Sequence, residues 1–169
     1  EPLKSSGEFI TMNFGSNTTF SSSNTIGAFL NGNYMTNYVD SSYANMIEDN
    51  TTWYLGTVEF GTSYKLAKYM DINMSSTTSA TTEAKVGLLR YGELMAGQFD
   101  RYVNNTNFWL LTPYNSSYVR CVYSNGSASY DSPSSYSAGV RPSVNLKSNV
   151  QITSGTGIKS DPFVLTLGS

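Results

Sequence analysis

The sequence predicts one α+β domain, in which about two short helices pack on mixed or antiparallel sheets and long polar loops join the elements. Three observations lead to this fold class. Short segments alternate apolar with polar residues, as half-buried strands do. Two segments repeat apolar residues at spacings of three and four, as amphipathic helices do. The chain of 169 residues is long enough to bury a single core.

The N-terminal part, residues 1–24, is predicted to hold a strand over residues 8–14 and then a polar loop. A helix follows from Thr25, and Gly32 ends or frays it, because glycine commonly stops a helix. Its buried side consists of Ile26, Phe29, Leu30 and Tyr34. A second helix begins after Asp40, whose side chain can cap it. The buried stripe of that helix consists of Tyr43, Met46 and Ile47.

The middle of the chain is predicted to alternate strands with irregular segments. Residues 53–58 form a strand rich in aromatic and β-branched groups, and residues 84–91 form another with a mostly apolar centre. Between them, residues 73–82 are a loop rich in Ser and Thr with almost nothing to bury, so we expect the least order there. A helix of one or two turns over residues 92–97 and a loop over residues 100–107 follow.

Residues 108–146 are predicted to form the central sheet and the candidate binding face. In the first strand, Trp109 and Leu111 should face one side of the sheet. Phe108 and Leu110 should face the other side, so we expect this strand to be covered on both faces.

A hairpin follows in the same region. Residues 118–123 and 128–130 read as its two strands, and Asn125-Gly126 between them is typical of a type I′ turn. Residues 140–146 form a further strand.

The chain closes with another predicted strand pair. Residues 149–153 pair with residues 163–167 through a turn rich in glycine. In the preceding strand, Pro142 indicates a position at a sheet edge or a bulge, because proline cannot donate to a neighbouring strand.

Composition excludes several function classes. The chain has no His, so it has no Ser-His-Asp or Cys-His arrangement and no histidine metal ligand. Its one cysteine, Cys121, lies in an alternating strand pattern and is interpreted as a small buried hydrophobe. The formal net charge of −2 has no clustered basic face behind it, which argues against nucleic acid as a partner. We expect no enzyme activity, no catalytic residue, no metal site and no cofactor.

The polar composition indicates where the protein works. Only 13% of the residues are charged, while Ser, Thr, Asn, Gly and Tyr are abundant. Uncharged polarity of this kind is common on secreted surfaces, so we expect an extracellular location. No apolar run approaches the roughly 20 residues of a membrane-spanning helix, so this segment should not insert into a membrane.

The chain resembles a known family in three segments, which read LNGNYMTNYVDSSYANMIEDNTTWYLG, AKVGLLRYGELMAG and FWLLTPY…GVRPSVNLKSNVQITSGTGIKSDPFVL. The family consists of secreted or surface-attached bacterial domains, mostly of Gram-positive type, and it is similar in fold to the C-type-lectin-like and formylglycine-generating-enzyme-like group. The resemblance covers about residues 26–165. It implies a C-type-lectin-like fold and the exposed head of a larger protein, in some members a pilin-like one.

The resemblance does not extend to the chemistry of that group. Formylglycine-generating enzymes hold copper with a pair of cysteines, whereas this chain has only Cys121. Sugar-binding C-type lectins hold calcium with a Glu-Pro-Asn or Gln-Pro-Asp loop, and neither motif occurs in the sequence.

The binding site is predicted within residues 114–136, where tyrosines alternate with small polar residues. Tyrosine gives a large contact area for only two rotatable bonds, while Ser and Asn adapt their hydrogen bonds, as in antibody paratopes. Tyrosine rings can also stack on sugars. The predicted ligand-binding residues are Tyr114, Asn115, Ser116, Ser117, Tyr118, Arg120, Tyr123, Asn125, Tyr130, Asp131, Ser135 and Tyr136.

These features favour a recognition or adhesion module that binds a protein or a glycan on a target surface, with fibre or pilus subunits as further partners. One alternative is a variable receptor-binding protein of a phage or bacterium, diversified by a retroelement. That class also resembles a C-type-lectin-like fold and concentrates variation near its C-terminal end. A second alternative is a structural subunit of a surface fibre without a ligand.

Overall fold

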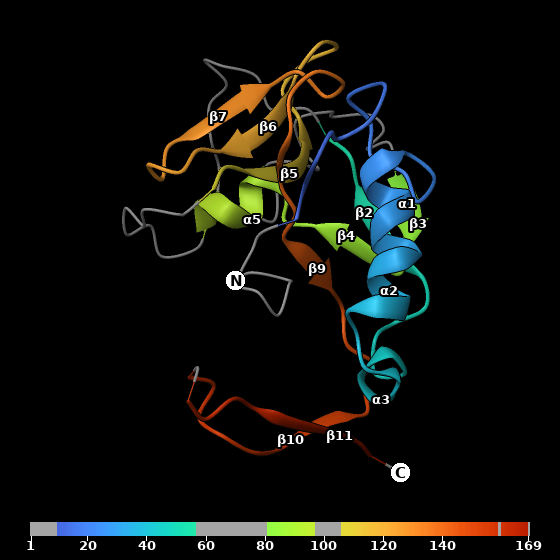
Figure 1. Ribbon diagram of the computed structural model, residues 1–169. Helices are drawn as coiled ribbons and strands as arrows, with labels where there is room; N and C mark the ends of the chain where they lie inside the picture. The colour runs from blue at the N-terminus through green and yellow to red at the C-terminus, as the bar shows by residue number, and fades with distance from the viewer. Residues whose placement is uncertain (1–9, 57–80, 97–105, 159, 169) are drawn as a thin grey trace.

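A computed structural model describes residues 10–56, 81–96, 106–158 and 160–168 of the chain. Over these residues the protein consists mostly of β-sheets with a few short helices, which is compatible with the α+β class (Figure 1). The helices are α1 (Thr25–Asn31), α2 (Asn33–Asn37), α3 (Ser41–Ala44) and α5 (Tyr91–Ala96). None of the described helices is long and apolar enough to cross a membrane.

The strands fall into one larger sheet and three strand pairs. The larger sheet contains β1 (Thr11–Met12), β8 (Ala138–Gly139), β5 (Phe108–Pro113), β6 (Val119–Val122) and β7 (Ala128–Asp131), in that spatial order. The pairs are β2 (Thr51–Tyr54) with β3 (Thr81–Ala84), β4 (Val86–Leu88) with β9 (Pro142–Val144), and β10 (Val150–Ser154) with β11 (Val164–Leu167).

The strand β5 lies in the middle of the larger sheet, antiparallel to β6 and parallel to β8, so this sheet is mixed. All of its residues are buried, because both faces of the sheet are covered. Trp109 and Leu111 pack into one hydrophobic cluster, and Phe108 and Leu110 pack into a second one. The predicted strand with two covered faces is therefore confirmed.

The helix α1 begins at Thr25 and ends before Gly32, as the sequence predicts, while Phe29 and Tyr34 of the predicted buried side are half-buried and Tyr34 lies in α2. The side chain of Asn24 accepts a hydrogen bond from the N–H of Gly27 at 2.9 Å, which satisfies a free donor of the first turn. Ile26 and Leu30 are fully buried. The helix stops at Gly32, as predicted, and α2 continues the chain from there.

The last residue of α1 attaches the helix to the β-structure. The side-chain amide of Asn31 donates to the carbonyl oxygens of Gly27 and Val86, each at 2.9 Å. Its oxygen accepts from the N–H of Val86, also at 2.9 Å. The amide thus pairs with the first residue of β4 as a neighbouring strand would.

The helix α3 is shorter than the sequence predicts. Asp40 does cap it, with its carboxylate accepting from the N–H of Ser42 at 2.9 Å, but the helix ends at Ala44. The predicted buried stripe is wrong, because Tyr43 is 45% exposed and the two buried residues that follow, Met46 and Ile47, lie beyond the helix.

Extended pairing takes the place of the missing helical turns. The N–H of Glu48 donates to the carbonyl of Asn145 at 2.8 Å, and the N–H of Lys147 donates to the carbonyl of Met46 at 2.9 Å. Ile47 also forms an antiparallel bridge with Leu146. A partner segment about a hundred residues away therefore determined the local structure, and helical spacing could not reveal it.

The predicted strand over residues 84–91 is divided in two. β3 ends at Ala84 and pairs with β2, whereas β4 pairs with β9, so the chain changes partner at Lys85. Tyr91 begins α5 instead of ending a strand. The edge position predicted for Pro142 agrees with its place in β9, which pairs with β4.

Some predicted loop residues are strand residues in the structure. Thr81 and Thr82 belong to β3 and pair with Tyr54 and Trp53 of β2, although the sequence assigned them to a loop. The rest of that loop and the end of the predicted strand before it lie outside the described residues, as do residue 97 and most of the predicted loop at residues 100–107.

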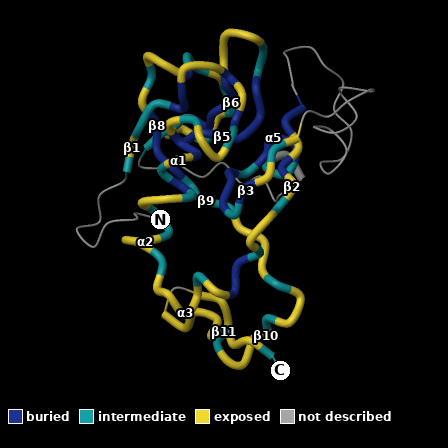
Figure 2. The backbone as a smooth tube through the Cα atoms, turned by 90° about the vertical axis from the view of Figure 1, so that its right-hand side faces the viewer, coloured by how far each residue is buried: buried dark blue, intermediate teal, exposed yellow. Residues whose placement is uncertain are grey.

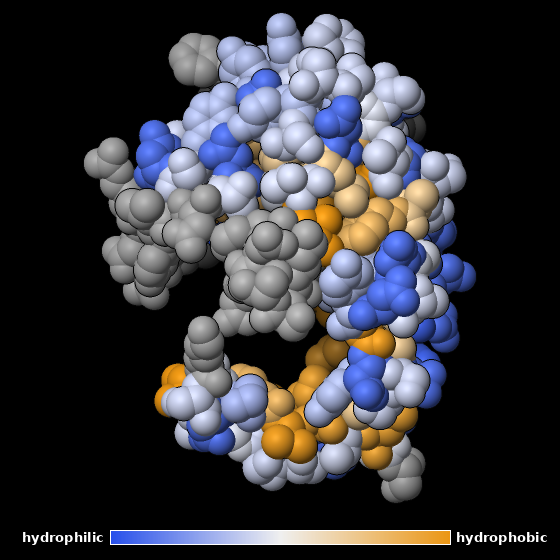
Figure 3. Space-filling model, viewed as in Figure 1, coloured by the Kyte–Doolittle hydropathy of each residue, from blue (hydrophilic) through white to orange (hydrophobic). Residues whose placement is uncertain are grey.

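The predicted C-terminal strand pair is confirmed. β10 and β11 are antiparallel, and the turn between them uses Gly155 and Gly157 at φ values of +89° and +80°, which glycine adopts without strain. This hairpin projects away from the other strands (Figures 1 and 2). Its residues are mostly exposed, and apolar groups colour much of its surface in Figure 3.

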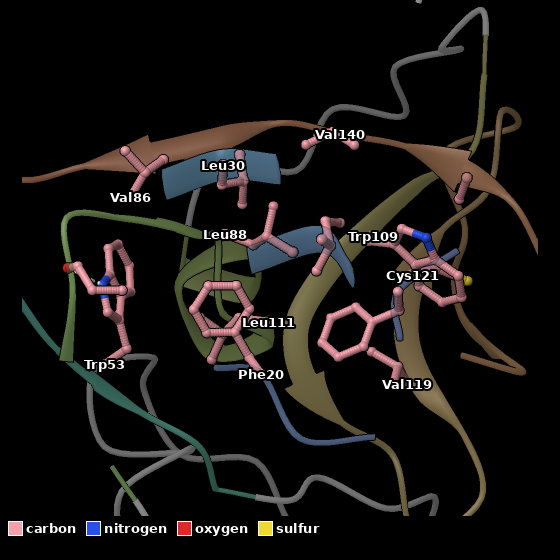
Figure 4. Packing of buried hydrophobic residues seen from close by; sticks show 14 of the residues in the cluster. Phe20, Leu30, Trp53, Val86, Leu88, Trp109, Leu111, Val119, Cys121 and Val140 are labelled. Carbon is pink, nitrogen blue, oxygen red and sulfur yellow. Dashed lines mark hydrogen bonds between the residues drawn. The ribbon is translucent and has the colours of Figure 1, made fainter. Parts of the chain in front are cut away.

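The larger hydrophobic cluster collects side chains from α1, β4, β5 and β6 (Figure 4). The rings of Phe14 and Trp109 form a T-shaped pair with centroids 5.7 Å apart, and the indole N–H of Trp109 donates to the carbonyl of Met12 at 2.9 Å. The indole N–H of Trp53 donates to the carbonyl of Ala84, also at 2.9 Å. Both buried indoles therefore keep a hydrogen-bond partner.

Candidate recognition surface

Three of the predicted ligand-binding tyrosines form one group beside β6 and β7. The rings of Tyr114 and Tyr130 stack with centroids 3.9 Å apart and planes at 3°. The ring of Tyr118 leans on Tyr130 at 5.3 Å and 54°. These three residues are the tyrosine stack. Tyr118 and Tyr130 are 40% and 41% exposed, so the stack forms part of the protein surface.

Arg120 supports the tyrosine stack from the interior. Its guanidinium carbon lies 4.6 Å from the ring centroid of Tyr114 and 4.4 Å from that of Tyr91, and the residue is only 5% exposed. A desolvated cation–π contact of this kind contributes up to about 2 kcal/mol. Tyr91 is anchored in turn, because its N–H donates to the hydroxyl of Thr112 at 2.9 Å. A row of contacting side chains therefore runs from the interior to the surface, in the order Tyr91, Arg120, Tyr114 and Tyr130.

A tight turn brings Tyr114 and Tyr118 together. The side-chain oxygen of Asn115 accepts from the N–H groups of Ser117 and Tyr118 at 2.8 and 3.0 Å. The N–H of Tyr114 donates to the carbonyl of Tyr118 at 2.9 Å. Asn115 therefore shapes the turn, as asparagine side chains often do, and Ser116 and Ser117 are exposed at its tip.

The register of the β6–β7 hairpin places Tyr130 in the stack. Arg120 lies directly opposite Tyr130 in the two strands. Opposed residues of neighbouring strands project to the same face, so the cation and the ring share a side of the sheet. Val119 and Cys121, which alternate with Arg120, face the larger hydrophobic cluster on the other side.

Three other predicted residues lie on that other side of the sheet. The hydroxyl of Tyr123 donates to Asp131 at 3.0 Å, and the Tyr123 ring packs against the larger hydrophobic cluster. The rings of Tyr136 and Trp109 form a T-shaped pair, with centroids 5.8 Å apart and planes at 88°, and the Tyr136 hydroxyl is hydrogen-bonded to the side-chain amide of Asn107. The structure therefore separates Tyr123, Asp131 and Tyr136 from the tyrosine stack.

Asn125 and Ser135 make local contacts within turns. The side chain of Asn125 accepts from the N–H of Ser127 at 3.0 Å and from its hydroxyl at 2.6 Å. The hydroxyl of Ser135 donates to that of Ser132 at 2.8 Å. The predicted type I′ turn is wrong, because Gly126 has a φ of +84° but no described non-glycine residue has a positive φ. A type I′ turn needs a positive φ at both of its central residues, whereas here only Gly126 has one.

The thiol beside the stack is buried and protonated. Burial raises the pKa of the Cys121 thiol to about 12, and the negative charge of Asp131 adds to the rise, so the thiol stays protonated and unreactive at neutral pH. Cys121 is fully buried, which agrees with its interpretation as a small hydrophobe. The described residues hold no group of His, Cys, Asp and Glu side chains that could bind a metal ion.

Tyr91 is a buried residue behind this surface that sequence reasoning missed. It reads as the last residue of an apolar strand, and its role depends on a contact with Arg120 from a different element. No spacing rule relates the two positions, so only the fold could bring them together.

The fold and this surface define a mostly β domain with an exposed group of stacked aromatic side chains. A family model described as Domain of unknown function (DUF6273) matches residues 10–148, and the chain belongs to this family. No curated protein and no solved structure matches the chain. The matched residues include the whole tyrosine stack and end before β10 begins.

Proposed function

We propose that this domain is a non-enzymatic recognition or adhesion module, the exposed head of an extracellular bacterial surface protein or pilin-like protein, and that it binds its ligand through the tyrosine stack. The observation that carries the proposal is the fixed position of these partly exposed rings, which Arg120 and Asn115 hold in place. Side chains that are ordered before binding lose little conformational entropy when a ligand arrives.

A protein ligand is favoured over a glycan. A sugar stacks on an open ring face, but Tyr114 has Arg120 against its ring and Tyr130 stacked on it as well. The stack therefore offers ring edges and hydroxyl groups, which combine apolar contact with hydrogen bonding and suit a protein surface. The glycan remains the second ligand class, because Tyr118 is tilted by 54° out of the stack and offers its ring to a sugar.

The fold class that accompanies this proposal is the C-type-lectin-like one. The resemblance at residues 109–113 and 139–142 supports it, and these segments supply strands that are neighbours in the sheet, since Phe108 of β5 pairs with Gly139 of β8. An experimental structure that superimposes on lectin-like domains over β5, β6 and β8 would support this class, and one that does not would remove it.

A structural subunit of a surface fibre is the second candidate function. The observation that favours it is the hairpin β10–β11, which exposes the apolar side chains of Ile152, Val164 and Leu167. A subunit of this kind would need contacts with its neighbours and no ligand at the tyrosine stack.

The experiment compares two pairs of exposed tyrosines. Tyr118→Ser with Tyr130→Ser removes the exposed rings of the stack, while Tyr38→Ser with Tyr43→Ser removes rings that are 39% and 45% exposed elsewhere. Purified proteins are tested on an array of extracellular proteins and glycans. We expect the first variant to bind roughly tenfold more weakly or worse, and the second to stay within about twofold of the unmodified protein.

Two results would count against the recognition proposal. If both variants lose binding equally, or neither does, the tyrosine stack is not the binding surface. If the unmodified protein binds nothing on the array, the structural subunit becomes the better proposal. Circular dichroism and thermal unfolding of each variant establish that the comparison concerns folded proteins.

A further inference from the structure

The strand β7 forms a free edge of the larger sheet. In the order β1-β8-β5-β6-β7 it is the last strand, and among the described residues only β6 pairs with it. Figure 1 shows β7 on the outer side of this sheet, beside β6. Tyr130 is 41% exposed and the other three residues of β7 are half-buried, whereas all four residues of β6 are buried. No described segment therefore closes this edge.

The register of β6 and β7 determines which backbone groups lie on the free edge. The N–H of Tyr123 donates to the carbonyl of Ser127 at 2.9 Å. In an antiparallel ladder, hydrogen-bonded pairs alternate with pairs that exchange no hydrogen bonds. Counting on from this pair, the N–H and C=O groups of Ala128 and Tyr130 point away from β6. The edge thus presents donors and acceptors in alternation, directly beside the tyrosine stack.

These groups determine the kind of backbone that fits the edge. Donors and acceptors that alternate at strand spacing are complementary to another extended chain, and peptides add to the sheets of several recognition domains in this way. Proteins usually protect such an edge with Lys, Pro or a bulge. β7 reads Ala-Ser-Tyr-Asp, without lysine or proline, and its pairing with β6 is regular over all four residues.

The side chains of β7 indicate which residues the added strand would carry. Tyr130 belongs to the tyrosine stack, so the residue opposite it would place its side chain against the exposed rings. An apolar or aromatic side chain fits there.

The next position of an added strand lies opposite Asp131, on the other face of the sheet. The half-buried carboxylate of Asp131 accepts from the hydroxyl of Tyr123 at 3.0 Å and from the N–H of Ser132 at 3.2 Å. Both donors are uncharged, so a lysine or arginine at this position would add a charge-assisted hydrogen bond. The edge is therefore complementary to an apolar residue followed or preceded by a basic one.

We propose that an extended segment of a protein partner adds to the free edge of β7 as a further strand, with an apolar or aromatic residue on the tyrosine stack and a basic residue beside it that faces Asp131. This inference rests on the proposed function, since it names the form in which a protein ligand reaches the tyrosine stack. It goes beyond that function because backbone groups of Ala128 and Tyr130 hold the partner.

Short random linear peptides displayed on phage test the proposal. Peptides selected on the unmodified protein should carry an apolar or aromatic residue next to Lys or Arg. Selection on Asp131→Asn should no longer enrich the basic residue, because the variant keeps a side-chain acceptor but loses the charge.

The strongest peptide from this selection is then synthesised and measured against proline variants. Ala128→Pro removes an N–H that points outward and none that bonds to β6, so it should bind the peptide at least about tenfold more weakly. The matched control is Ile152→Pro in β10. The N–H of Gly168 donates to the carbonyl of Asn149, so by the same alternation the N–H of Ile152 points away from β11. This control should bind within about twofold of the unmodified protein.

Proline can also distort β7, so amide hydrogen exchange of the unmodified protein provides a second measurement. The outward N–H groups of Ala128 and Tyr130 should exchange fast in the free protein. Saturating peptide should slow both at least about tenfold. The N–H of Ser129 points to β6 and should exchange slowly with or without the peptide, which makes it an internal reference.

Several outcomes overturn the proposal. It fails if no peptide is enriched, if the selected peptides lack the basic residue, if Ala128→Pro binds as the unmodified protein does, or if the two outward amides gain no protection. Tyr118→Ser with Tyr130→Ser separates this failure from that of the proposed function. If this variant loses the ligands found on the array while the outward amides stay unprotected, the tyrosine stack binds without strand addition. If it keeps those ligands, the proposed function itself is wrong.

Discussion

Asn31 offers a direct test of how α1 is attached to the β-structure. Its side-chain amide donates to the carbonyl and accepts from the N–H of Val86, both at 2.9 Å. Val86 is fully buried, so Asn31→Ala leaves two backbone groups without these partners. Each unsatisfied buried group costs about 1–3 kcal/mol. Because Asn31 itself is half-buried and water can reach part of the site, we expect the unfolding free energy to fall by about 2–4 kcal/mol.

Urea unfolding followed by tryptophan fluorescence measures this loss, because both tryptophans are buried in the folded protein. The control is Asn37→Ala in α2, whose exposed amide donates to the side chain of Asn33, and it should lose less than about 0.5 kcal/mol. Asn31→Asp separates the two bonds, since it keeps an acceptor for the N–H of Val86 but removes the donor to its carbonyl. If Asn31→Ala is no less stable than Asn37→Ala, the amide does not hold the helix in place.

Other positions test the core and the frame of the surface. Gly87→Ala places a methyl carbon 2.7 Å from the Trp53 ring, so overpacking should lower the unfolding free energy, measured with urea, by about 1–3 kcal/mol. Stability equal to that of the unmodified protein would contradict this prediction. The Cys121 thiol has its pKa raised from 9.0 to about 12 by burial, so it ionises first in the unfolded chain. Its contribution to stability is present below about pH 9 and is lost as the pH rises towards 12, by at most about 1.4 kcal/mol per pH unit. Cys121→Ala should remove this pH dependence of the unfolding free energy. If the unfolding free energies of the two proteins change with pH in parallel, the Cys121 thiol is not its source. Tyr123→Phe removes the hydrogen bond from the tyrosine hydroxyl to Asp131 and should lower the unfolding free energy by about 0.5–1.5 kcal/mol. Ligand binding should stay unchanged. Unchanged stability or lost binding would contradict this prediction.

The parts of the fold that follow from local chemistry were predictable. The alternation at residues 108–111 gave a strand with two apolar faces, and the structure places those faces in separate clusters. Asp40 and Gly32 were recognised as a helix cap and a helix end, because their side-chain and backbone properties act within a few residues.

The parts that failed depend on distant partners. Met46 and Ile47 are apolar at helical spacing, yet backbone pairing with residues 145–147 draws this segment out of a helix. The strand over residues 84–91 divides at Lys85 because its two parts pair with β2, which precedes it in the sequence, and with β9, which follows it. Periodicity reports which residues are apolar, but it carries no information on which segment will cover them.

The tyrosines show what strand geometry adds to composition. Tyr118 and Tyr123 flank β6 an odd number of positions apart, and side chains at odd spacing point to opposite faces of a strand. The sequence therefore already separates these two rings, although their composition alone places them in one surface. The sequence does not show which face of β6 carries the tyrosine stack, because this strand has apolar residues on both faces, with Val119 on one and Val122 on the other. The buried Arg120 determines the face, because its contacts with Tyr91 and Tyr114 hold the tyrosine stack on the side of the sheet away from the larger hydrophobic cluster. On that side, Tyr118 and Tyr130 stay exposed.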